Sequence, residues 1–129
     1  MDPTLFVLAK GLPRAALDGL AEALAKFPAD RALRGRELAV PANIGAVGAD
    51  SRGVRANVTD THHYVSRWAW GDDGPTSLCS CTAGRVCEHT YALGIMLLAA
   101  ARRVGRWDHP RWVKLAPLEL ATEPVGLQA

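Results

Sequence analysis

The 129-residue sequence predicts an α+β fold in a single domain: an N-terminal amphipathic helix, a small antiparallel sheet, and a ββα-like knuckle that leads into a long buried helix. Three observations predict this fold. Leucines recur at helical spacing within residues 13–27, apolar and polar side chains alternate over residues 54–70, and an apolar helical stripe follows a group of cysteines and a histidine. We expect three segments: 1–35 as an N-terminal helical segment, 36–105 as the sheet and knuckle, and 106–129 as a C-terminal extension.

The N-terminal helix is predicted from both its ends and its apolar stripe. Pro13 suits a first-turn position, and Pro28 ends the helix. The stripe between them consists of Leu17, Leu20, Leu24 and Phe27. Before this helix, residues 5–8 are either a short strand or part of the same core. After it, we expect residues 30–34 to form a short helical turn that Gly35 ends.

The sheet is predicted from a two-residue period. Residues 37–50 are small and apolar with interspersed proline and glycine, which favours one or two bent strands over a helix. Residues 54–59 alternate as a half-buried strand does, and residues 62–70 place Tyr64, Trp68 and Trp70 on one face. A hairpin through the turn-like residues 59–61 is the simplest arrangement. Residues 71–75 have loop composition, and we expect ordered structure to resume at Ser77.

All three cysteines and a histidine lie within eleven residues, with the spacing C-x-C-x5-C-x-H. The four are Cys79, Cys81, Cys87 and His89. Residues two apart face the same side of a strand but point about 200° apart on a helix. We therefore expect Cys79 and Cys81 at the end of a strand, Cys87 just before a helix, and His89 in its first turn. Three thiolates and one imidazole are the donors of a closed tetrahedral site, which predicts a structural Zn²⁺ as cofactor.

Other interpretations of this group are less favoured. Buried free cysteines can simply fill a core, but three cysteines and a histidine rarely fall at this spacing by chance. Four protein ligands leave no open position for substrate, and the sequence lacks the metalloprotease, nucleophile-elbow and P-loop motifs. We therefore expect no enzyme activity and no small-molecule substrate. A redox or metal-release sensor is a weaker third option, because no resolving cysteine lies outside the group.

The segment after the cysteines predicts a long helix buried on more than one side. Its apolar stripe consists of Leu93, Met96, Leu97, Ala100, Ala101 and Val104. Arg102 and Arg103 suit the negative end of the helix dipole, and Gly105 suits a left-handed cap. We expect residues 107–118 to be irregular and to pack through their tryptophans, and about ten terminal residues to be loose.

The C-x-C pair, the C-x-H pair running into an apolar helix, and the aromatic strand at residues 64–68 resemble the SWIM zinc finger. The likeness covers about residues 53–101, with a weaker echo at residues 34–37. SWIM domains occur within chromatin-remodelling ATPases, plant transposases, signalling kinases and recombination-promoting factors. The resemblance implies DNA binding or protein interaction. It implies none of the activities of those proteins, because this sequence has no ATPase, nuclease or kinase segment.

The charge distribution suggests where a partner would bind. Net charge is only +2, but residues 85–114 carry six basic and two acidic side chains. The residues that we expect to contact a partner are Arg85, Arg102, Arg103, Arg106, Arg111, Lys114 and Trp68. The resulting hypothesis is a zinc-stabilised DNA-binding or DNA-repair and recombination accessory protein. The alternative is an adaptor that docks a larger DNA-processing protein without touching DNA.

The sequence also suggests a compartment. The first residues lack the basic start and long apolar run of a signal peptide, and the apolar run at residues 91–101 is far shorter than the roughly 20 residues that cross a bilayer. Three cysteines cannot all pair with one another, and their close spacing suits a metal better than a disulfide. We expect a cytoplasmic protein without a membrane role.

Overall fold

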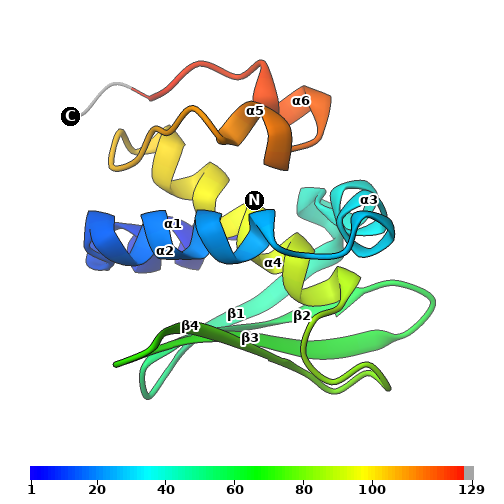
Figure 1. Cartoon of the computed structure of the whole chain (residues 1–129). Coiled ribbons are helices and arrows are strands. Elements are labelled where there is room, and N and C mark those ends of the chain that lie inside the picture. The colour runs from blue at the N-terminus through cyan, green and yellow to red at the C-terminus, as the bar shows by residue number, and fades with distance from the viewer. Residues whose placement is uncertain (127–129) are drawn as a thin grey trace.

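The computed structural model describes residues 1–126 and confirms the α+β fold. Its sheet contains four antiparallel strands in the order of the chain: β1 (Ile44–Asp50), β2 (Gly53–Thr59), β3 (His63–Gly71) and β4 (Gly74–Cys79). The helices all lie on one face of this sheet (Figure 1). The long helix α4 (Glu88–Arg103) runs through the middle of the molecule and contacts the three N-terminal helices on one side and three strands on the other.

The N-terminal part is entirely helical. It contains α1 (Pro3–Gly11), α2 (Arg14–Ala25) and α3 (Ala29–Leu38). Helix α2 matches the predicted helix, and its leucines are fully buried. The strand considered for residues 5–8 is wrong, because these residues belong to α1. The Asp2 carboxylate caps that helix by accepting a hydrogen bond from the Thr4 amide at 2.9 Å, and Leu5 and Ala9 bury one face of it.

Helix α3 continues through Gly35 to Leu38, so the predicted end at Gly35 is wrong. The glycine is required by packing and not by a turn. A Cβ atom at position 35 would lie 2.5 Å from Cδ1 of Tyr91 on α4. The absence of a side chain therefore lets the backbone of α3 approach the tyrosine ring closely. A short 3₁₀ turn, Pro41–Asn43, then leads into β1.

The strands place one face of the sheet against the helices. In the β2–β3 pair, Val54 lies opposite Trp68 and Ala56 lies opposite Ser66, and all four side chains are buried. Strand β4 starts at Gly74, three residues before the predicted resumption of order. The β3–β4 connection is a tight turn through Asp72 and Asp73, and Gly74 has a positive φ of 97°.

Helix α4 is buried along nearly its whole length, from His89 to Arg102, as the sequence predicts. Gly105 follows its end with a φ of 70°, which confirms the left-handed cap. The next segment is more regular than expected. It contains α5 (Trp112–Leu115) and α6 (Leu118–Ala121), and Trp107 and Trp112 are buried in the core.

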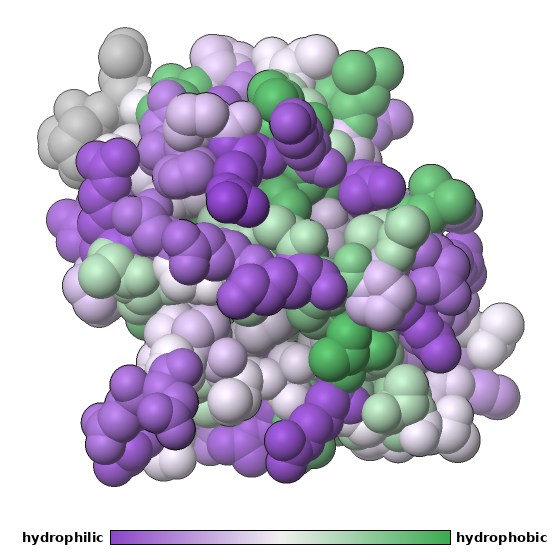
Figure 2. All heavy atoms as spheres, in the orientation of Figure 1, coloured by the Kyte–Doolittle hydropathy of each residue, from purple (hydrophilic) through white to green (hydrophobic). Residues whose placement is uncertain are grey.

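The expected loose C-terminus agrees only partly with the structure. Leu120 is buried, and the Gly126 amide donates a hydrogen bond to the Arg102 carbonyl at 2.8 Å. Residues 127–129 lie outside the described part of the chain. Within residues 1–126, no helix combines the length and apolarity that crossing a membrane requires. Hydrophobic side chains on the surface seen in Figure 2 fall in separate areas between hydrophilic ones.

Replacing Gly35 by alanine tests the packing of α3 against α4. We expect Gly35→Ala to lower the free energy of unfolding by about 1–3 kcal/mol, because the new methyl group overlaps the Tyr91 ring. Alanine is the better helix former, so propensity alone predicts the opposite sign. Gly11→Ala is the matched control: it has open space around the new Cβ and should change stability by less than about 0.5 kcal/mol. Chemical denaturation measures both; an equally stable Gly35→Ala protein would contradict the account.

Candidate metal centre

The fold brings the four predicted ligands together. The ligand atoms of Cys79, Cys81, Cys87 and His89 all lie within 4.8 Å of one another. The His89 Nδ1 atom is 3.7 Å from the Cys79 sulfur and 3.8 Å from the Cys87 sulfur. As predicted, Cys79 ends β4, Cys87 is the N-cap of α4, and His89 lies in the first helical turn. The site therefore joins the last strand of the sheet to the central helix.

The loop between the two ligand pairs folds back on the end of β4. The Gly84 amide donates to the Cys81 carbonyl at 3.1 Å, and the Cys79 amide donates to the Gly84 carbonyl. Gly84 has a φ of 79°, a conformation that side chains strongly disfavour. This turn returns the chain toward α4, so that Cys87 reaches the sulfurs of the first pair.

The two buried sulfurs each have a hydrogen-bond partner from the surrounding fold. The Thr90 amide donates to the Cys87 sulfur at 3.4 Å, in the position where serine or aspartate usually caps a helix. The Ser66 hydroxyl lies 3.3 Å from the Cys79 sulfur. Both contacts, together with the positive end of the α4 dipole, favour negative charge on sulfur.

The ionisation of one buried sulfur affects that of the other. A hydrogen bond between them, reinforced by burial, raises the pKa of Cys87 to about 12, whereas the same hydrogen bond lowers the pKa of Cys79. Two neighbouring buried thiolates would repel each other without a cation. A metal ion supplies that cation, and its binding must release the proton of Cys87.

His89 is held by its ring face and its second nitrogen. The ring is buried and stacks on Tyr64, with ring centres 4.2 Å apart. Its Nε2 atom lies 3.3 Å from the Asp60 carboxylate. With its proton on Nε2, the ring can donate a hydrogen bond to Asp60. The lone pair of Nδ1 then points at the sulfurs. This arrangement of carboxylate, histidine and ligand cluster is typical of metal-binding histidines.

Helix α3 supports the site from outside. The Arg34 side chain donates to the Asp60 carboxylate at 2.7 Å, and Arg31 pairs with Glu88, which neighbours His89, at 3.2 Å. Burial opposes ionisation of Asp60, but hydrogen bonds from Arg34 and His89 outweigh it and lower the pKa of this carboxyl. Asp60 is therefore a carboxylate at neutral pH and can hold the imidazole in place.

The donor set fits a tetrahedrally coordinated metal. Three sulfurs and one imidazole nitrogen suit soft or borderline ions, and the four together fill a tetrahedral shell. The cluster is not sealed on every side. Cys81 is partly exposed and, with Tyr64 and Thr82, lines an open cavity of about 570 Å³.

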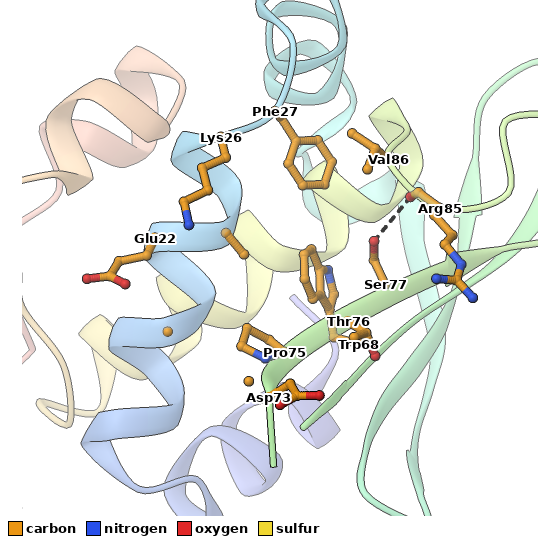
Figure 3. Close-up of a pocket in the computed structure, with 13 residues that line it drawn as sticks. Glu22, Lys26, Phe27, Trp68, Asp73, Pro75, Thr76, Ser77, Arg85 and Val86 are labelled. Atoms are coloured by element: carbon orange, nitrogen blue, oxygen red, sulfur yellow. Dashed lines mark hydrogen bonds between the residues drawn. The ribbon is translucent and has the colours of Figure 1, made fainter. Parts of the chain in front are cut away.

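The structure gives internal roles to several residues that we expected to contact a partner. Trp68 is only 2% exposed, and its indole nitrogen donates to the Thr90 carbonyl at 2.8 Å. It lies at the floor of a cavity of about 520 Å³ between α2 and β4 (Figure 3) and is not accessible for stacking on bases. The face of β3 that carries Trp68 is the face that the helices cover.

Three of the predicted arginines hold the C-terminal segment and α1 in place. Arg102 bonds the Asp108 carboxylate and the Glu123 carbonyl, and Arg103 pairs with the Glu123 carboxylate. The Arg106 side chain donates to the Lys10 carbonyl at 2.9 Å. The hydrogen bond from Arg103 lowers the pKa of Glu123. These arginines bind carbonyl and carboxylate groups of the same chain, and Arg106 does so from an exposed position.

The other predicted cations are exposed but lie far apart. Arg85 belongs to the ligand loop, whereas Arg111 and Lys114 lie at α5. Figure 1 places α5 and this loop at opposite ends of the molecule. The basic residues at 85–114 therefore do not form the continuous binding surface that their closeness in sequence suggests.

Sequence analysis missed the residues around the ligands, namely Asp60, Tyr64, Ser66 and Thr90. The contact of Thr90 with Cys87 could have been predicted from local sequence, because Thr90 follows the predicted helix cap by three residues. Asp60 had none: it lies 29 residues before His89, in a stretch that was interpreted only as a turn. Comparisons of the chain with protein-family models, with curated proteins and with solved structures gave no match.

Asp60 is expected to tune metal affinity through His89. Asp60→Ala should raise the dissociation constant for Zn²⁺ by about 10–100-fold, because the imidazole loses the group that fixes its proton and orientation. Asp60→Asn keeps an oxygen acceptor for the imidazole and should lose less zinc affinity than Asp60→Ala. Glu22→Ala removes the same charge from an exposed position on α2 and is the control. Competition with a chromophoric chelator measures the affinities, and equal values for Asp60→Ala and the wild type would refute this role.

Proposed function

We propose that the chain is a zinc-stabilised, non-catalytic interaction module of the SWIM type. The observation that carries the proposal is the convergence of three cysteine sulfurs and the His89 Nδ1 atom within 4.8 Å, at the junction of β4 and α4. Zn²⁺ is the metal that we assign, because it favours thiolate and imidazole donors in tetrahedral structural sites. The C-x-C and C-x-H spacing of these donors supports the SWIM assignment.

The role that we propose for zinc is structural. It would tie the end of the sheet to the start of the central helix. Apparent binding free energies for such sites are on the order of 10–16 kcal/mol, comparable with or larger than the whole stability of a small domain. Because four protein ligands fill a tetrahedral site, no position is left for a reacting group, which supports a non-catalytic role.

Protein interaction is the mode of action that the geometry supports best. Trp68 is buried, and the side chains of Arg102, Arg103 and Arg106 are engaged within the chain. The resulting hypothesis is an adaptor that presents a surface to a larger protein, with a DNA-processing protein as the partner that the resemblance suggests.

DNA binding, including a repair or recombination accessory role, is the second candidate. It is favoured by the exposure of Arg85, Arg111 and Lys114. Contacts from these side chains to phosphates would make the affinity fall steeply as salt rises. An adaptor that does not touch DNA shows no such binding at low salt.

Removing one ligand tests the structural role of the metal. We expect Cys87→Ser to lose most of the bound zinc and to unfold at a markedly lower temperature, because a buried metal ligand is lost. Serine can still cap α4, so the loss of stability reports on the metal site and not on the helix cap. Thr82→Ala alters an exposed residue of the same loop and should keep both properties. Elemental analysis gives zinc content, and circular dichroism gives the melting temperature. Unchanged zinc and melting in Cys87→Ser would exclude the proposal.

A further inference from the structure

The outer face of the sheet carries a surface that, apart from Arg85, has been given no role above. We propose that it is a docking site for an acidic, amphipathic segment of a partner protein. The surface consists of Arg55, Val65, Arg67, Leu78 and Arg85, and we call it the arginine face. This inference rests on the proposed interaction function and names the chemistry of its partner.

The arginine face is left open by the fold. The helices cover only the opposite side of the sheet (Figure 1), where the aromatic residues of β3 lie. Because side chains alternate along a strand, Arg55 on β2 and Arg67 on β3 point away from the helices. Leu78 of β4 lies opposite Arg67 and is 46% exposed, and Val65 is 49% exposed.

The register places like charges side by side. Arg55 lies directly opposite Arg67 in the β2–β3 pair, an arrangement that disfavours folding. Asp50 pairs with Arg67 at 2.8 Å. Within residues 1–126, no carboxylate lies within ion-pair distance of Arg55 or Arg85. The face therefore holds more positive charge than the chain itself compensates.

Arg85 extends this surface across the edge of β4. Figure 3 shows its side chain pointing away from Glu22 and Lys26, toward the sheet, while its carbonyl accepts a hydrogen bond from Ser77 at 3.2 Å. With Arg67, Thr76 and Leu78, it lines an open hollow of about 200 Å³. The ligand loop positions Arg85, so the metal site and the arginine face share one structural element.

The chemistry of this face favours an acidic peptide over nucleic acid. Two exposed apolar side chains, Val65 and Leu78, lie beside the arginines and offer contacts that phosphate groups cannot use. Tyr64, Trp68 and Trp70 of β3 lie on the covered side, so the face lacks a large aromatic platform for stacking bases. Carboxylates bind arginine in bidentate geometry, and neighbouring leucine or similar side chains would cover Val65 and Leu78.

Acidic residues near the face set the limits of the complementary surface. Asp50 already forms an ion pair with Arg67. Asp72 and Asp73 form the turn at one end of the β3–β4 hairpin. The carboxylates of a partner would therefore lie over Arg55 and Arg85, away from that turn. The complementary segment has acidic residues on both sides of an apolar pair.

A binding experiment with defined probes tests this proposal. The probe is a fluorescein-labelled peptide of about 16 residues with glutamates and leucines at helical spacing. Two further peptides replace its glutamates by lysine or its leucines by glutamine, and labelled single- and double-stranded DNA form the nucleic-acid arms. Fluorescence anisotropy is recorded with the zinc-loaded full chain at low and at physiological salt.

The variants compare equal changes of charge at two places. Arg55→Gln combined with Arg85→Gln removes two cations that have no carboxylate partner, and Arg111→Gln combined with Lys114→Gln removes two from α5. We expect the acidic peptide to bind the wild type, the first variant to weaken binding by about ten-fold, and the second by less than about two-fold. Leu78→Ser should also weaken binding, and the lysine peptide should not bind.

Three results would overturn the inference: no binding of the acidic peptide to the wild type, equal weakening by the two double variants, or DNA binding that is tighter and equally dependent on Arg55 and Arg85. Zinc content and circular dichroism are measured on the same samples. If the wild type contains no zinc, the proposed metal function is refuted. If the protein is folded and zinc-loaded but does not bind the acidic peptide, only the proposed role of the arginine face is refuted.

Discussion

The fold depends on the burial of two cysteine sulfurs and an imidazole where β4 meets α4. Burying thiolates close together is unfavourable without a cation. The hydrogen bond to Cys79, together with burial, accordingly raises the pKa of Cys87. A metal ion bound there would turn the same arrangement into a crosslink between sheet and helix. Because α4 contacts the N-terminal helices and three strands, a constraint at its first turn fixes the position of the whole core. The chain of contacts from His89 through Asp60 to Arg34 carries this constraint to α3.

Elements with strong periodicity were predicted from the sequence, and those defined by contacts were not. The leucine stripe of α2, the alternation in β2 and β3, and the apolar run of α4 are local patterns, and the structure confirms them. Helix α1 was missed because a four-residue apolar run fits a strand or a helix equally well. Gly35 was interpreted as a helix end because its close approach to Tyr91 depends on a residue 56 positions away.

In the candidate site, too, features set by local sequence were predicted, and those set by distant contacts were not. Its four ligands follow from spacing within eleven residues, and the structure brings them together. The roles of the arginines did not follow, because Arg102, Arg103 and Arg106 bind groups that are distant in sequence, including Glu123 and the Lys10 carbonyl. Only strand register reveals that Arg55 and Arg67 lie side by side on the uncovered face of the sheet. This placement moves the expected partner surface from the arginines at the end of α4 to the sheet. Arg85, in the ligand loop, is the one residue of the original set that stays in it.

The central claim is that a closed site of three thiolates and one imidazole holds a zinc ion that joins the sheet to α4. X-ray absorption spectroscopy at the zinc edge of the purified full chain tests it most directly. The account predicts about three sulfur neighbours near 2.3 Å and one nitrogen neighbour near 2.0 Å, with no bound water. A shell with two or fewer sulfurs, or with a water oxygen in place of a protein ligand, would contradict the claim.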